Sequence, residues 1–503
     1  EGNALGNLGT VYNSLGQYQQ AIDFYEQSLA IAREIGNLAG EGTVLGNLGT
    51  VYNSLGQYQQ AIDFLEQHLA IAREIGNRAG EGRALGNLGN VHINLDQYQQ
   101  AIDFLEQHLA IARAIGNLSG EGIALNNLSE AYRNLGQYQR AIDFLEQKLV
   151  ITREIGDRAG EGSGLGSLGN VYLALGQYLQ AIEFYEQGLS IAREIGDRRG
   201  EGNVLNNLGV AHLSLEQYPE ATEKLFSAIE VLESLRNEDI PDAHRITFFD
   251  AQRPPYISLQ KALIAQDEIE RALVISEQGR ARAFVSSLAE RQNPEASSLP
   301  LPSIVEIQRT AQTQNATLVQ YSNVSLADDD SPQLYIWVIQ PTGEITFRSV
   351  DLSGLDSSLF EFITTSRDAI GLRSRNNDAT IEVALTPEAL RTRADRQRQI
   401  LQELHTLLID PIADLLPTDP DAPVIIIPHQ ELFLVPFAAL VDANGDYLIQ
   451  HHTLLTAPSI QVLQLLGEQQ TTTAAGDPLI IGNPIMPSIW NPATGEEEIL
   501  SSL

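Results

Sequence analysis

Residues 6–37 read GNLGTVYNSLGQYQQAIDFYEQSLAIAREIGN, and residues 46–77 repeat this stretch almost letter for letter. The pattern continues with a fixed period of 40 residues. The Glu-Gly pair that opens each copy stands at Glu1, Glu41, Glu81, Glu121, Glu161 and Glu201. A fixed period of this length indicates stacked repeats, in which each unit contacts only its neighbours. The first half of the chain is therefore predicted to be a repeat array.

Each repeat is predicted to form two helices joined by a tight turn. In the second copy, helix A is expected over residues 38–55, with Asn37 as its N-cap. Gly56 turns the chain, helix B follows over residues 58–75, and Gly76 ends it. Other copies carry Asp96 and Glu216 in place of the turn glycine. The turn therefore accepts other residues.

The two helices each have a distinct apolar side when residues are placed about 100° apart. In the second copy the apolar side of helix A carries Leu45, Leu48, Tyr52 and Leu55. The apolar side of helix B carries Ala61, Ile62, Leu65, Leu69 and Ala72. The opposite side of helix A is polar, with Thr43, Asn47, Thr50 and Ser54. One side of helix A thus belongs to the core, and the other is a polar surface that recurs in every repeat.

Composition excludes several function classes. A net charge of -34 argues against binding to nucleic acids or to anionic membranes. The absence of cysteine excludes disulfides, thiolate-bound zinc and a cysteine nucleophile within this chain. No signal peptide and no apolar run of about 18 residues are present, so a cytoplasmic protein is expected. Because residue 1 is Glu1 and the only methionine is Met486, the chain looks like a fragment that lacks at least its initiator end.

The repeats resemble the tetratricopeptide repeat over residues 1 to about 235. The residues that carry the resemblance are Leu48, Gly49, Tyr52, Gly56, Tyr58, Ala61 and Leu65. The unit is longer than the usual one of about 34 residues, and this longer form resembles the one in kinesin light chains and G-protein-signalling modulator scaffolds. It also lacks the usual proline at the end of helix B. The resemblance implies a right-handed superhelix of about six repeats, whose concave wall is made by the A helices. Ligands of such grooves are usually peptides.

Asparagine recurs on the side of helix A that this resemblance makes concave. One position carries Asn7, Asn47, Asn87, Asn127, Ser167 and Asn207, and neighbouring positions add Asn13, Asn53, Asn90, Asn94, Asn126, Arg133, Asn134, Asn170 and Asn206. A carboxamide donates and accepts hydrogen bonds, so the series suits the backbone of an extended peptide. Two other interpretations stay open: the asparagines are soluble filler, or they bond to the neighbouring A helix and hold the stack together. The recurring His68 and His108 are expected on a solvated surface, and no metal site is predicted.

The repeat pattern fails after Leu235, and the second half has a mixed pattern of helices and strands. We expect a degenerate, capping helical pair over 236–290, a linker over 291–303 and an α/β domain over 304–503. Strands are predicted at 317–325, 333–340, 344–350, 424–427 and 478–482. Helices are predicted at 387–409 and 459–466.

This second half resembles the CHAT domain, a caspase-like domain found attached to tetratricopeptide repeats in cyanobacteria and other bacteria. The matching segments are ERALVISEQGRARAF at 270–284, VIIIPHQELFLVPFAAL at 424–440, DYLIQHHTLLTAPSIQVL at 446–463 and PLIIGNP at 478–484. The resemblance implies that peptidases of the family use a His–Cys dyad in motifs that follow this last segment. Neither motif is present before Leu503, so we expect an incomplete domain without catalytic residues. His429 is interpreted as an ordinary residue at a strand end.

Three functions follow. The first is an interaction module that binds a peptide or protein partner in the repeat groove, with a CHAT domain that is non-catalytic in this chain and without a cofactor. The alternative is the sensor and partial catalytic domain of a ligand-regulated cysteine endopeptidase whose dyad lies beyond residue 503. A third is a degenerate scaffold. The oligomeric state is left open.

Overall fold

The computed structural model describes residues 1–235, 253–280, 302–325, 332–355, 357–370, 387–470, 488–491 and 496–499. The chain divides into two compact units, Glu1–Pro255 and Tyr256–Leu503. The strand expected at 478–482 and most of the linker expected at 291–303 lie outside the described residues. The domain boundaries expected from the sequence remain predictions. In the described part of the chain, no helix has the length and apolar character that a membrane crossing needs.

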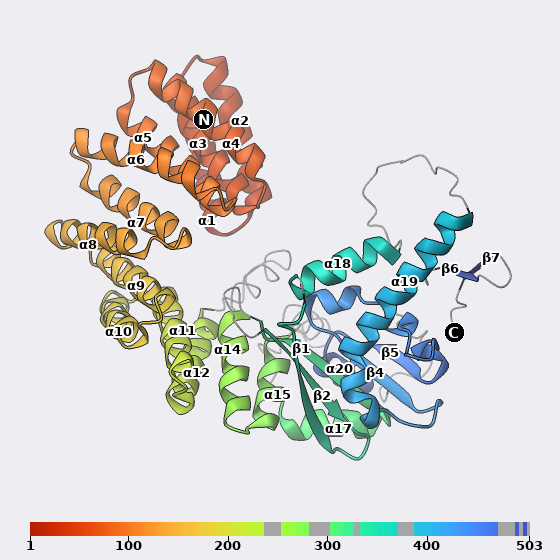
Figure 1. Ribbon diagram of the computed structural model, residues 1–503. Coiled ribbons are helices and arrows are strands. Elements are labelled where there is room, and N and C mark those ends of the chain that lie inside the picture. Colours follow the sequence, from red (N-terminus) through yellow and green to blue (C-terminus); the bar gives the residue numbers. More distant parts are fainter. Residues whose placement is uncertain are drawn as a thin grey trace. The chain divides into compact units, whose positions relative to one another are not determined.

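The first unit is a stack of helix pairs that forms a superhelix (Figure 1), as the repeat pattern predicted. The A helices are α1 (Gly2–Ser14), α3 (Leu38–Ser54), α5 (Arg78–Asn94), α7 (Leu118–Asn134), α9 (Arg158–Ala174) and α11 (Arg198–Ser214). The B helices are α2 (Tyr18–Glu34), α4 (Tyr58–Glu74), α6 (Tyr98–Ala114), α8 (Tyr138–Glu154), α10 (Tyr178–Ile195) and α12 (Tyr218–Ser234).

The helix ends form at the residues that the sequence indicated. The side chain of Asn37 accepts a hydrogen bond from the backbone N–H of Gly40 at 3.1 Å and so caps α3. Gly56 and Gly76 adopt φ values of 70° and 68°, in the left-handed region that favours glycine. Asp96 and Glu216 take the same conformation at φ values of 58° and 57°. The turn therefore has one geometry in all copies, and the substituted copies carry some backbone strain.

Glycine in the A helices lets the paired helices approach closely. A Cβ atom built on Gly49 would lie 2.5 Å from Cγ of Leu65. Leu45, Leu48 and Leu65 are consequently fully buried, as predicted. Leu55 was expected in the same core, but it is 38% exposed because it forms the C-cap residue of α3, beyond the packed part of the helix.

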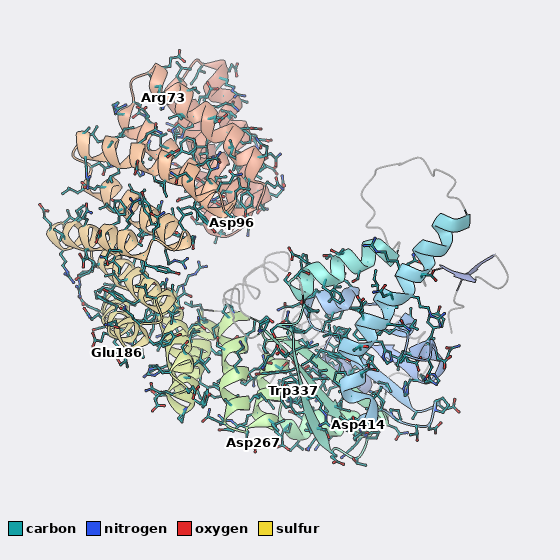
Figure 2. All side chains as sticks on the ribbon, in the orientation of Figure 1. Arg73, Asp96, Glu186, Asp267, Trp337 and Asp414 are labelled. Carbon is teal, nitrogen blue, oxygen red and sulfur yellow. The ribbon has the colours of Figure 1, made fainter. Side chains whose placement is uncertain are left out.

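The recurring Glu-Gly phrase is explained by ion pairs between repeats. An arginine near the end of each of the B helices α2, α4, α6, α8 and α10 binds the glutamate near the start of the following A helix, as for Arg73, labelled in Figure 2. These pairs are Arg33–Glu41 (2.7 Å), Arg73–Glu81 (3.0 Å), Arg113–Glu121 (2.6 Å), Arg153–Glu161 (2.7 Å) and Arg193–Glu201 (2.8 Å). The glutamates are largely buried, so each pair connects the end of one repeat to the start of the next.

The second unit contains a five-stranded sheet in the order β3-β2-β1-β4-β5. Its strands are β1 (Thr317–Asn323), β2 (Gln333–Ile339), β3 (Ile345–Asp351), β4 (Pro423–Ile427) and β5 (Thr453–Thr456). The first three strands are antiparallel to one another, whereas β4 runs parallel to both β1 and β5. A separate hairpin joins β6 (Ser488–Asn491) and β7 (Glu496–Ile499).

Helices cover both faces of this sheet. Side chains of α18 (Leu359–Ile370) and α19 (Pro387–Leu408) pack with the residues of one sheet face. The other face meets α15 (Ile269–Gln278), since Trp337, labelled in Figure 2, donates its indole N–H to the carbonyl of Ile269 at 3.3 Å. Helix α17 (Ile304–Gln314) contacts both α15 and α20 (Ile460–Gln470). Helix α14 (Arg253–Ala265) precedes α15 in the chain.

Candidate functional site

The A helices form the inner wall of the repeat array. Consecutive A helices contact one another along the whole stack, from α1 and α3 to α9 and α11. Within the described residues, consecutive B helices do not approach each other in this way. Elements on the inner side of a curved stack are the more closely spaced ones. The polar side of the A helices therefore lines the concave face.

Four of the predicted asparagines donate a hydrogen bond to the preceding A helix. These bonds join Asn87 to Thr50 (3.4 Å), Asn94 to Asn53 (2.9 Å), Asn127 to Asn90 (2.7 Å) and Asn207 to Asn170 (3.0 Å). Each bond crosses one repeat interface. For these residues the geometry supports the interpretation that asparagine holds the stack together, and peptide binding stays a prediction.

The other predicted residues differ in whether their side chains form hydrogen bonds within the chain. Asn126 accepts hydrogen bonds from Lys148 at 2.9 Å and from Ser167 at 3.2 Å. Asn206 donates to the adjacent Asn207 at 3.2 Å. Within the described residues, Asn7, Asn13, Asn47 and Asn134 form no side-chain hydrogen bond, and Arg133 is half-buried. The carboxamides of Asn7, Asn13, Asn47 and Asn134 are therefore not engaged by the described residues of the chain.

His68 and His108 are buried, so the expectation of a solvated surface is wrong. Their exposed fractions are 5% and 6%. The space comes from the opposing A helices, because a Cβ atom on Gly46 or Gly86 would lie 2.7 Å or 2.8 Å from the histidine Nδ1. Burial lowers the pKa of His68 to about 4, with a smaller contribution from the charge of Arg83, and it also lowers the pKa of His108. Both side chains are therefore neutral near pH 7.

Lys148 occupies the same position of helix B in the fourth repeat, and the sequence analysis did not select it. It is 5% exposed, and its Nζ donates to Asn126 at 2.9 Å and to Ser163 at 3.2 Å. Burial lowers the pKa of Lys148 to about 8, so the ammonium stays charged near pH 7. The sequence contained a signal for this residue, namely one position that varies among otherwise similar B helices. The six repeats carry Ser28, His68, His108, Lys148, Gly188 and Ala228 at this position.

The concave face combines a constant row with variable rows. The row of Asn47 is asparagine in every copy except at Ser167. Two flanking rows vary: one reads Asn3, Thr43, Arg83, Ile123, Ser163 and Asn203, and the other reads Thr10, Thr50, Asn90, Glu130, Asn170 and Val210. Arg83 and Glu130 are exposed, and Ile123 is 54% exposed. In the constant row, Asn87, Asn127 and Asn207 bond to the preceding A helix, whereas the flanking rows differ in charge and polarity from one repeat to the next.

Removal of the Asn127 carboxamide is expected to destabilise the array by about 1 kcal/mol. Asn127 is 9% exposed, and its bond to Asn90 is the shortest of the four. Asn7→Ala is the matched control, because Asn7 is exposed in α1 and both alanines gain the same helix propensity. Urea unfolding followed by circular dichroism at 222 nm measures the difference. Equal stabilities of Asn127→Ala and Asn7→Ala would contradict the structural role.

His429 follows β4, and its surroundings agree with a strand-end role. Its Nδ1 accepts the backbone N–H of Asn323 at 3.0 Å. Asp442, Asp446 and His451 place ligand atoms within 4.8 Å of one another. Asp442, however, accepts the backbone N–H groups of Asn444 and Asp446 at 2.9 Å and 2.8 Å, which is the geometry of a side-chain-stabilised turn. This group therefore has a structural explanation.

Comparisons with known proteins agree with both halves of this description. The family model of the tetratricopeptide repeat matches residues 1–74, 80–152 and 162–234, and that of the CHAT domain matches residues 398–500. Tetratricopeptide repeat protein 28 of Homo sapiens is 27% identical over 377 residues, and its Mus musculus counterpart is 27% identical over 381 residues. Both alignments cover 55% of this chain, which spans only 15% of the length of either relative.

Solved structures with similar helix stacks are also known. A putative kinesin light chain of Podosopora anserina with nearly identical TPR-like repeats is 25% identical to this chain, with a TM-score of 0.34. The match covers 39% of this chain and 96% of the kinesin light chain structure. BtubC from P. vanneervenii is 16% identical to this chain, with a TM-score of 0.40. The match covers 49% of this chain and 98% of the BtubC chain. On the sequence matches, this chain carries a tetratricopeptide-repeat array followed by a CHAT domain.

Proposed function

We propose that this chain is a protein-interaction scaffold whose concave face binds an extended segment of a partner protein. The observation that carries the proposal is the polar surface of the A helices, which recurs with the 40-residue period in a chain of net charge -34. Its constant asparagines and its neighbouring threonines and serines are uncharged. These uncharged side chains can bond to a peptide backbone, and the charged Arg83 and Glu130 stand in the flanking rows.

The side chains of this surface have two roles: some hold the A helices together, and others are available to a bound peptide. The bonds between Asn127 and Asn90 and between Asn207 and Asn170 hold adjacent A helices in register. Asn47 and Asn134 keep their carboxamides available, and each hydrogen bond to a peptide contributes about 1 kcal/mol net. The variable side chains Arg83, Ile123 and Glu130 are exposed beside them and determine which peptide is preferred.

The CHAT domain takes no catalytic part in this chain under this proposal. The chain contains no cysteine, and a thiolate nucleophile requires one. The alternative is that a longer protein is a ligand-regulated cysteine endopeptidase, with this chain as its sensor and part of its catalytic domain. The encoding locus distinguishes the two: a reading frame that continues into a His-Gly motif and a later cysteine favours the peptidase. The cytoplasmic location stays a prediction.

Selection of a random peptide library against the full chain tests the proposal. The groove variant is Arg83→Thr, Ile123→Ser and Glu130→Thr, in which each new residue is the one found at the same position of another repeat, so the stack is preserved. We expect enriched peptides to bind this variant at least tenfold more weakly, with an unchanged melting temperature.

The control variant changes the exposed B-helix residues Glu66, Glu106 and Glu146 to glutamine. Its peptide affinity is expected to equal that of the original chain. Failure to enrich any peptide, or an equal loss of affinity in the control, would overturn the proposal.

A further inference from the structure

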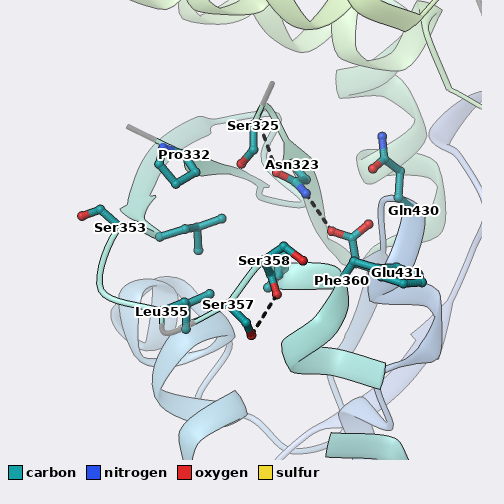
Figure 3. Close-up of a pocket in the computed structure, with 12 residues that line it drawn as sticks. Asn323, Ser325, Pro332, Ser353, Leu355, Ser357, Ser358, Phe360, Gln430 and Glu431 are labelled. Atoms are coloured by element: carbon teal, nitrogen blue, oxygen red, sulfur yellow. Dashed lines mark hydrogen bonds between the residues drawn. The ribbon is translucent and has the colours of Figure 1, made fainter. Parts of the chain in front are cut away.

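Two buried histidine rings in the second and third repeats each leave a ring nitrogen without a hydrogen bond. Buried polar side chains usually bond to a partner, as Asn323 does in the pocket of Figure 3, where its carboxamide donates to Glu431 at 2.7 Å. Nδ1 of His68 and Nδ1 of His108 are buried, and neither has a hydrogen-bond partner among the described residues. The same unsatisfied nitrogen therefore occurs at equivalent positions of α4 and α6, 40 residues apart.

Glycines of the paired A helices shape the space around both rings. A Cβ atom on Gly46 would lie 3.0 Å from Cε1 of His68, and one on Gly86 would lie 3.1 Å from Cε1 of His108. Each ring therefore lies directly against the backbone of its A helix. A glycine has no side chain that accepts a hydrogen bond, so a proton added at Nδ1 would be buried without a partner.

Lys148 shows what a charged side chain needs at this position. It is the equivalent residue of α8, and its Nζ donates to the carboxamide oxygen of Asn126 at 2.9 Å and to the hydroxyl of Ser163 at 3.2 Å. Asn126 stands at the position that Gly46 and Gly86 occupy in the histidine repeats. The chain thus places acceptors beside the buried ammonium and leaves them out beside the two histidines.

The charged groups around His68 do not compensate an added proton. Helix α4 packs against α3 and α5, and on α5 the charge of Arg83 opposes protonation of His68. The glutamates at the start of these two helices, Glu41 and Glu81, are already bound by arginines. The residues one turn away on α4 itself are apolar, namely Phe64, Leu65, Ile71 and Ala72.

His108 has similar surroundings between α5 and α7. On α7, Ile123 takes the position of Arg83, and Glu121 is bound by Arg113. The residues one turn away on α6 are again apolar, namely Phe104, Leu105, Ile111 and Ala112. Burial by itself lowers the pKa of His108. Both rings are thus held neutral by the way in which their repeats pack.

We propose that the second and third repeats form an acid-sensitive segment of the array, in which protonation of His68 and His108 separates α4 from α3 and α6 from α5. A charged imidazolium is stable only where water or an acceptor reaches it, so the helix pair has to open. Helices α3 and α5 carry Asn47 and Arg83 on the concave face, so opening changes the surface offered there. The opening itself does not depend on the function proposed for that face.

The direction and range of the pH effect follow from the shift at His68. Folding lowers the pKa of His68 from 6.5 to about 4, so its stabilising contribution is complete above about pH 6.5 and is lost as the pH falls toward 4. At about pH 5, His68 alone shifts the equilibrium between folded and open repeats about 30-fold toward the open form. His108 shifts it further in the same direction, since its pKa is lowered as well.

Hydrogen exchange of the full chain, followed by mass spectrometry at about pH 7.5 and about pH 5, tests the proposal. Each rate is divided by the rate of the urea-unfolded chain at the same pH, which removes the intrinsic pH dependence of exchange. We expect the amides of α3 to α6 to lose at least about tenfold protection at the lower pH.

The amides of α9 to α12 are the internal control. In these helices Gly188 and Ala228 take the position of the histidines, whereas Arg–Glu pairs between repeats occur as in the rest of the array. Titration of carboxylates would therefore affect both groups of helices. An equal loss of protection in both groups, or no loss in α3 to α6, would overturn the proposal.

Two variants assign the effect to the buried rings. The double variant His68→Ser, His108→Ser adopts the arrangement of the first repeat, where the hydroxyl of Ser28 donates to the carbonyl of Gly2 at 2.8 Å. We expect its protection in α3 to α6 to be the same at both pH values. His92→Tyr is the matched control, because four other repeats carry tyrosine at this position, and it is expected to behave like the original chain.

A loss of protection in the double variant as large as in the original chain contradicts the assignment to the histidines. The comparison of α3 to α6 with α9 to α12 uses the unaltered chain, so it tests the proposal even where the double variant folds poorly.

Discussion

Replacement of Arg280 by methionine is expected to destabilise the second unit by about 3–5 kcal/mol and to leave the repeat array unchanged. Arg280 is 5% exposed, and its guanidinium donates to the backbone carbonyls of Tyr321 and Pro428. It thereby joins the end of β1 to the loop that follows β4. Methionine fills similar volume but leaves both carbonyls without this donor.

The same substitution leaves a buried carboxylate without its counter-charge. Glu277 is 1% exposed, and its Oε2 lies 3.9 Å from Nε of Arg280. Its Oε1 accepts the backbone N–H of Gln461 at 2.9 Å in the first turn of α20. Burial raises the pKa of Glu277 and lowers that of Arg280 to about 10, whereas each charge opposes the shift of the other. Loss of Arg280 therefore affects α15, α20 and the sheet together.

Tryptophan fluorescence measures this effect separately from the repeats. The two tryptophans, Trp337 and Trp490, both belong to the second unit, whereas circular dichroism at 222 nm is dominated by the repeat helices. Arg271→Met in α15, the helix that precedes Arg280, is the control: Arg271 is exposed, and its replacement is expected to change the free energy of unfolding by less than about 0.5 kcal/mol. If Arg280→Met lowers the free energy of unfolding of the second unit by less than about 1 kcal/mol, the buried pair of Glu277 and Arg280 does not stabilise this unit as proposed.

The repeat array was largely predictable because its sequence signals are local and recur. Asn37 and Gly76 mark helix ends through their own backbone and side-chain preferences. The burial of His68 was not predicted, because it depends on the absence of a side chain at Gly46, on the other helix of the pair.

The second unit was less predictable because its contacts join distant parts of the chain. The hydrophobic runs located β1, β2, β3 and β4. The edge strand β5 was not predicted, since its four residues are partly exposed and lack a buried run. Arg280 was also missed, because it bonds to carbonyls far along the chain.

Two glycine substitutions in the A helices are expected to change the stability of the repeat array in opposite directions. A Cβ atom on Gly89 would lie 2.6 Å from Cγ of Leu105 and 3.4 Å from the carbonyl oxygen of Ala101. Gly89→Val therefore overpacks α5 against α6 and is expected to cost about 2–3 kcal/mol. Valine is chosen because the fourth repeat carries Ser129 at the same position, which shows that a small side chain can be accommodated there.

Gly166→Ala is the matched substitution in α9, where it should stabilise the array by about 0.5–1 kcal/mol. A Cβ atom at this position meets nothing within 4 Å, since the facing helix carries Gly188 instead of a larger residue. Alanine restricts the unfolded chain and favours the helix without a steric cost. Urea unfolding followed at 222 nm compares the variants, and unchanged tryptophan unfolding confines both effects to the repeats. If both substitutions destabilise the array, the space available at each glycine does not determine the effect of adding a side chain there, and the prediction is wrong.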